Sequence, residues 1–374
     1  MRSLRFGTAT ALVLLTASLA SCAAAPQPSA PVEHSASVEQ SASAEPVETP
    51  TPLTCGDLVS SDDAARALTG TDGTTPDPVE AVQPSQAVEQ ALLTGAGGIA
   101  CSWRVGAGQL GISAEQGDWA YLSVEVLPDA AAEWVPPYAG DTPSEEHRTV
   151  GSVEATTSAG ETGWWISAPV GSAWVDVRVT SSGLISGGSR FEGAAFAGVL
   201  DAMMPAAETT FAAITTATAE QLSWPHLPVR AGEARCDGGL DQAGIENALQ
   251  LDGAPVKYSL ADARALPIDA LADAVEARIG VFRCELFAEG YGYTDITVVR
   301  DFESVIDELA TMPDIASALE PVVLVGAVDG ETALQARRED GPRSPVYFTL
   351  GQTLYGVSSD GAATVAGAII AQTR

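Results

Sequence analysis

The spacing of four cysteines constrains this chain more than any other feature of its sequence. Cys55 and Cys101 are 46 residues apart, and Cys236 and Cys284 are 48 residues apart. Four cysteines allow three disulfide connectivities, but the near-equal spacings favour local pairing, Cys55 with Cys101 and Cys236 with Cys284. Each closed loop would stabilise a fold by at most about 4 kcal/mol through chain entropy. A zinc site is the alternative, although the chain has no Cys-x-x-Cys pair.

The matching spacings indicate an internal repeat, and landmarks in the same order support it. Each copy has a helical pattern with a polar cap and an Ala-Leu pair, then an alternating strand, and then the expected start of another helix. These landmarks lie at Ser60 or Ser61, Ala67-Leu68, Leu122–Val126 and Asp129 in the first copy, and at Asp241, Ala248-Leu249, Ile296–Val298 and Asp301 in the second.

Each copy ends with a hairpin signal followed by a helix signal. Glycine at the first position of a two-residue turn accepts a positive φ, so a Gly-X pair between apolar runs predicts a β-hairpin. The turns are Gly171-Ser172, between Trp164–Val170 and Ala173–Thr180, and Gly351-Gln352, between Val346–Leu350 and Thr353–Ser358. The closing helices are expected at Glu192-Gly193-Ala194-Ala195 and Asp360-Gly361-Ala362-Ala363. We therefore predict two tandem, similar α+β domains, each a mainly antiparallel sheet packed with helices and stapled by one disulfide.

The N-terminus has the features of an export signal. Arg2 and Arg5 precede the apolar stretch Phe6–Ala20, which is too short to span a bilayer. The sequence Leu19-Ala20-Ser21-Cys22 resembles the lipobox of bacterial lipoproteins. This resemblance implies cleavage after Ser21 and attachment of diacylglycerol to Cys22, which would also account for the odd fifth cysteine. An ordinary signal peptide with a chance cysteine is the alternative.

Charge and composition characterise the chain beyond Cys22. The chain has 18 basic and 49 acidic residues and a net charge of −31, so nucleic acid and bare anionic membrane are disfavoured as partners. Residues 23–52 are rich in Ala, Pro, Ser and Glu without periodicity, which is typical of a disordered tether. The expected organisation is a signal peptide (1–21), a lipidated N-terminus and tether (22–52), a first domain (53–205), an interdomain segment (206–232) and a second domain (233–374).

A Cys-x-Trp motif, Cys101-Ser102-Trp103, accompanies the lipobox and the tether. In these features the chain resembles secreted lipoproteins of high-GC actinobacteria that carry a domain of unknown function. The second copy departs from the motif, since it reads Cys284-Glu285-Leu286. The resemblance implies a lipid-anchored envelope protein on the extracytoplasmic face of the cell membrane, and it transfers no catalytic residue.

No catalytic constellation stands out in the sequence. His147 follows Glu145 and Glu146, a trio more typical of a solvated loop than of a metal site, and His226 lies between prolines. Among 49 acids some pair must fall near the spacing that a glycosidase requires, but the sequence singles out none. We assign no catalytic residue, no metal and no cofactor.

The tryptophans distinguish the two copies, because six fall in the first domain and none in the second. Trp164 and Trp165 are adjacent on a predicted strand, so their rings point to opposite faces of the sheet and at least one is a candidate to bind a ligand. The alternative is that helices cover both rings.

These observations favour a non-enzymatic binding or scaffold lipoprotein. Its expected partners are the membrane, through the lipid anchor, and a small envelope molecule or an envelope protein. The alternatives are an envelope glycan hydrolase that uses paired carboxylates and a passive acidic spacer.

Overall fold

The folded part of the chain consists of antiparallel strands and helices. The computed structural model describes residues 51–374 apart from 107–116, 140–141, 161–162, 183–187, 228–239, 249–255, 261–269, 289–291, 329–330, 338–344, 360 and 373–374. All of these described residues belong to one compact unit, Pro50–Arg374. We call residues 51–227 the first half and residues 240–372 the second half.

The first sheet is antiparallel throughout and has seven strands in the order β1-β2-β3-β9-β8-β7-β6. The strands are β1 (Val79–Glu80), β2 (Ile99–Val105), β3 (Ala120–Leu127), β6 (His147–Val150), β7 (Val153–Ala159), β8 (Gly163–Val170) and β9 (Ala173–Ser181). A separate small hairpin pairs β4 (Tyr138–Ala139) with β5 (Thr142–Pro143).

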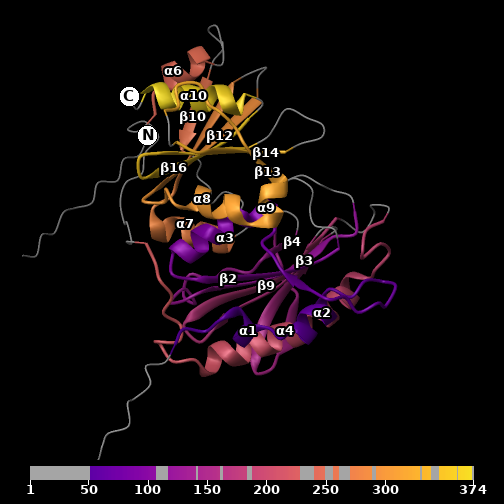
Figure 1. The fold of residues 1–374 in the computed structure, drawn as a ribbon. Helices are drawn as coiled ribbons and strands as arrows, with labels where there is room; N and C mark the ends of the chain where they lie inside the picture. Colours follow the sequence, from indigo (N-terminus) through magenta and orange to yellow (C-terminus); the bar gives the residue numbers. More distant parts are fainter. Residues whose placement is uncertain are drawn as a thin grey trace, which may run out of the picture. The chain divides into compact units, whose positions relative to one another are not determined.

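Helices cover one face of this sheet and part of the other. The helices α1 (Cys55–Leu58), α2 (Ser61–Ala67) and α4 (Phe196–Thr216) bury the first face, as Figure 1 shows. The short helix η1 (Pro84–Gln86) leads into α3 (Ala87–Gly95), which packs on β2 and β3. Ser60 caps α2 as predicted, because its hydroxyl accepts a hydrogen bond from the amide of Asp63 at 3.1 Å.

The second sheet is also antiparallel, with seven strands in the order β10-β11-β12-β16-β15-β14-β13. The strands are β10 (Val256–Leu260), β11 (Phe282–Ala288), β12 (Gly292–Arg300), β13 (Leu319–Pro321), β14 (Ala333–Ala336), β15 (Val346–Leu350) and β16 (Thr353–Ser358). Its helices are α6 (Gln242–Ala248), α7 (Ala270–Ile279), α8 (Val305–Thr311), α9 (Pro313–Ala318) and α10 (Ala362–Gln372).

The two sheets agree in strand order and in register. Cys101 pairs with Val124 across β2 and β3, and Cys284 pairs with Ile296 across β11 and β12. Both predicted hairpins are confirmed, and their first turn residues, Gly171 and Gly351, have φ of 60° and 59°. Where both sheets are paired, these registers match positions of the first sheet to positions of the second.

One of the sequence predictions about helix starts is wrong. Asp129 and Asp301 both adopt a left-handed conformation, with φ of 55° and 56°, whereas a residue that caps the start of a helix typically has a negative φ. The chain therefore makes turns after Asp129, and the helix that follows Asp301 begins only at Val305.

The first half closes with a longer helix than expected. Residue 205, the predicted end of the first domain, lies within α4, which continues through Pro205 to Thr216.

A disulfide joins Cys55 to Cys101, as predicted. Cys284 also takes part in a disulfide, but Cys236 lies outside the described residues, so the second predicted pairing stays a prediction. Cys22 and the predicted signal peptide likewise lie outside them.

A shared apolar core connects the halves. Leu92 and Leu93 of α3 lie in one buried cluster with Leu271 and Val275 of α7 and Leu309 of α8. A salt bridge between first-half Arg104 and second-half Asp314, with Nε 3.0 Å from Oδ2, lies in the same region. The two halves are therefore joined by packing as well as by the chain.

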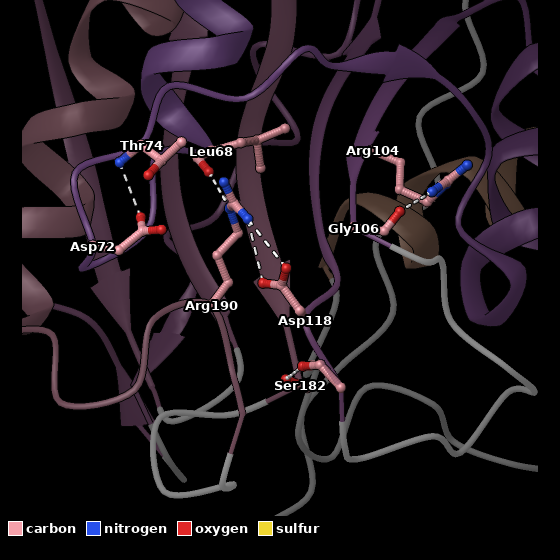
Figure 2. Close-up of polar contacts among 9 residues, drawn as sticks. Leu68, Asp72, Thr74, Arg104, Gly106, Asp118, Ser182 and Arg190 are labelled. Carbon is pink, nitrogen blue, oxygen red and sulfur yellow. Dashed lines mark hydrogen bonds and ion pairs between the residues drawn. The ribbon is translucent and has the colours of Figure 1, made fainter.

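Arg190 ties together three segments at one end of the first sheet (Figure 2). Its Nε donates to the carbonyl of Leu68, at the end of α2, at 2.6 Å. Its Nη1 lies 3.3 Å from a carboxylate oxygen of Asp118, just before β3. These contacts hold the end of α2 beside the start of β3.

Candidate functional site

The first sheet has a second face, on the side opposite α4. Helix α3 covers part of this face, and the rest of it carries mainly polar side chains. Alternation along β3, β9 and β8 sends the apolar side chains into the core with α4 and the intervening side chains to this second face. The register places these second-face residues in two rows across the strands. One row runs Ser102, Ser123, Arg178, Trp165 and Ser158, and the other runs Glu125, Asp176, Ser167, Thr156 and His147.

The first row is organised around Arg178. Its guanidinium lies 4.9 Å from the centre of the Trp165 ring, a cation–π distance. With the amide of Gln86 turned so that its oxygen faces the guanidinium, that oxygen accepts from Nη1 and Nη2 at 2.5 and 2.9 Å. Beside Arg178 the Ser123 hydroxyl is buried, and it has no hydrogen-bond partner among the described residues.

The second row is organised around Asp176. Its carboxylate accepts hydrogen bonds from the Ser167 hydroxyl and, at 3.0 Å, from the Trp174 indole. The Ser167 oxygen in turn accepts from the indole of Trp134 at 2.9 Å. Glu125 is directly opposite Asp176 on the neighbouring strand, and both acids are half-buried. The row therefore holds two carboxylates, and hydrogen bonds connect its Asp176 and Ser167 to the indoles of Trp174 and Trp134.

A groove of about 1120 Å³ begins at this row and runs past the edge strand β6. Trp134, Thr156 and Ser158 line it on the polar face, and Phe196 and Leu200 line it from α4; its remaining lining residues are Pro136, Thr142–Arg148, Ala159 and Ala197. Phe196 is 42% exposed although it is a large apolar residue. The groove therefore combines aromatic walls with hydrogen-bonding groups, as ligand sites commonly do.

The charged side chains along the groove include two exposed acids and an arginine that forms an ion pair. Glu145 and Glu146 are exposed, whereas Arg148 forms an ion pair with Asp201 of α4. His147 is also exposed, and its Nδ1 lies 3.2 Å from the Thr156 hydroxyl. Within the part of the chain that the structure describes, no three or more His, Cys, Asp or Glu residues are placed to hold a metal ion.

The two candidate tryptophans have different surroundings. Trp164 is fully buried, and its ring packs edge-on against Phe191 and Phe196, with centroids 5.4 and 6.4 Å away. Trp165 is half-buried on the polar face beneath Arg178. Of this pair only Trp165 can contribute a partly exposed ring to the polar face. The other histidine of interest, His226, is exposed and contacts the carbonyl of Leu227 through Nδ1.

Sequence reasoning missed Trp134, Asp176 and Arg178. Asp176 and Arg178 had a readable signal, because they alternate with Val175, Val177 and Val179 along one strand. Alternation identifies a polar face but not its neighbours. Trp134 comes from a loop, and only the folded chain brings it to Ser167.

The second sheet has different residues at the same positions. By register, Tyr347 stands where Ser167 does, and Gly356 stands where Asp176 does. A Cβ atom on Gly356 would lie 3.2 Å from the Tyr347 ring, so this pair fills the space with an aromatic ring. Burial raises the pKa of the Tyr347 hydroxyl to about 12. The carboxylate–serine–indole arrangement therefore belongs to the first sheet.

No helix among the described residues has both the length and the apolar character needed to cross a membrane. Comparison of the chain with protein-family models, with curated proteins and with solved structures found no match.

Proposed function

We propose that this chain is a lipid-anchored protein of the extracytoplasmic membrane face that binds an envelope molecule without chemical conversion. The groove beside β6 carries the proposal, because it exposes Phe196 and part of Trp134 together with polar groups of the second row. Such convergence of aromatic and polar groups in a concave site favours ligand binding. The lipobox and the tether support the location.

The repeat allows the two halves to have different roles. The shared strand order and register favour a tandem duplication of one α+β domain. In this proposal the first half carries the site, and the second half, with Tyr347 against Gly356, is a supporting copy.

Native mass spectrometry of the full chain, released gently from its own membrane, tests the proposal. We expect a mass increment that disappears on denaturation and that Phe196→Ser reduces. Tyr293→Ser is the matched control, since Tyr293 is an exposed aromatic residue of the second half, 49% exposed against 42% for Phe196. A bare mass in the wild type, or an equal loss in both variants, would contradict the proposal.

Glu125 and Asp176 favour glycan hydrolysis as the second candidate function. Residues directly opposite on antiparallel strands have Cβ atoms about 4.5–5.5 Å apart, so these two acids are near neighbours, and glycosidases act with a pair of nearby carboxyl groups. Incubation with cell-wall glycan should then release reducing ends, and Asp176→Asn should abolish the release. No release by the wild type would exclude this candidate.

A further inference from the structure

The strand β6 is an open edge of the first sheet. The carbonyl of Glu146 accepts from the amide of Thr157 at 2.8 Å, so residues 146, 148 and 150 direct their main-chain groups toward β7. The alternate residues, His147 and Thr149, direct theirs away from the sheet. In the described part of the chain no strand pairs with β6 on that side.

The corresponding edge of the second sheet is blocked. His147 pairs with Thr156, and Pro321 pairs with Leu334 at the equivalent register. Proline has no amide hydrogen to donate, and proline on an edge strand is a common protection against pairing with another chain. Both edge strands are short, since β13 has three residues and β6 has four. What β6 lacks is the proline, so His147 keeps the amide hydrogen that is missing at Pro321.

The surroundings of β6 suit a particular kind of extended chain. The groove places Trp134 and Phe196 beside the edge, where they can receive an apolar side chain. Glu145 and Glu146 are exposed next to it, and the whole chain has a net charge of −31. Opposite charge favours encounter and correct placement of a partner.

We propose that an extended cationic peptide segment of another envelope protein pairs with β6 and adds a strand to the first sheet. Main-chain hydrogen bonds to His147 and Thr149 would bind it, and the groove would select its side chains. This inference rests on the proposed binding function and specifies the ligand of the same site.

Fluorescence anisotropy with a labelled peptide of four Lys-Val repeats tests this inference on the full chain in detergent at low salt. We expect the Lys-Val peptide to bind at least about tenfold more tightly than a Glu-Val peptide of the same length. An N-methylated form of the Lys-Val peptide, which lacks alternate amide hydrogens, should bind about tenfold more weakly than its parent.

The variant Thr149→Pro removes the outward amide hydrogen and leaves the hydrogen bonds between β6 and β7 in place. It should weaken Lys-Val binding about tenfold, whereas the control Thr149→Val, which keeps the amide, should not. The N-methylated peptide needs no variant, so the test holds even if Thr149→Pro fails to fold.

Equal affinity for the two charge types, or undiminished binding of the N-methylated peptide, would overturn the inference. If that happened while Phe196→Ser still reduced the native mass increment, the proposed binding function would stand and only its peptide ligand would be excluded.

Discussion

Removal of the disulfide between Cys55 and Cys101 should destabilise the first half by about 4 kcal/mol. The bond closes a loop of 46 residues, and the loss of loop-closure entropy in the unfolded chain gives this value at 25 °C as an upper estimate. The loop connects α1 to β2, and Cys101 is buried in the first-half core. The double variant Cys55→Ala with Cys101→Ala avoids a lone thiol.

Urea unfolding followed by tryptophan fluorescence measures the effect, because all seven tryptophans lie at or before residue 224. With a slope of about 2 kcal/mol per molar urea, the midpoint should fall by about 2 M. Reduced wild-type protein should unfold at or below this midpoint, because reduction opens the disulfide of Cys284 as well. A decrease below about 1 kcal/mol in the free energy of unfolding would refute the entropic reasoning. It would mean that residues 55 and 101 stay close together in the unfolded chain even without the disulfide.

Three further outcomes follow from single contacts. Arg190→Met should cost about 1–3 kcal/mol, because it leaves the carbonyl of Leu68 without its donor, and a thermal melt showing no change would contradict this. Leu92→Ala should cost about 2–5 kcal/mol and, since Leu92 belongs to the shared core, should speed hydrogen exchange in both sheets; exchange confined to the first sheet would argue against coupling. The pKa of Tyr347 is raised from 10.0 to about 12 by burial, so the folded state holds this proton more tightly than the unfolded state. Its contribution, about 3 kcal/mol at most, is present below pH 10 and lost as the pH rises from 10 to 12. Tyr347→Phe should therefore make the urea midpoint depend less on pH between 10 and 12. An unchanged pH dependence of the midpoint would contradict a raised pKa for Tyr347.

Local sequence signals predicted the hairpins and several helix ends correctly. The turn at Gly171 and the cap at Ser60 depend on φ angles and hydrogen bonds between residues near in sequence. The helices α3 and α7 escaped prediction, although α3 has an apolar pattern and ends at a glycine. Both helices contribute apolar side chains to the core that the two halves share. This core forms between segments far apart in the chain, so the pattern of one half does not reveal it.

The candidate site depended on contacts between distant residues. The sequence indicated that the first half was the better place to search, from the distribution of tryptophans, and it singled out Trp164 and Trp165. Period-two alternation places these rings on opposite faces, but it cannot say which face a helix buries. The long helix α4 buries the face of Trp164, so only Trp165 remains partly exposed.

The sequence by itself determined the repeated order of cysteines, hairpins and closing helices, because each of these signals acts over a few residues. Only the tertiary structure decided that β9 pairs with β3, which brings Asp176 opposite Glu125, and that Trp134 reaches Ser167 across 33 residues. It also decided that one sheet edge carries His147 and the other carries Pro321 at the same register. Such pairings bring together segments far apart in the chain, and the free energy that selects them comes from the packing of the whole sheet.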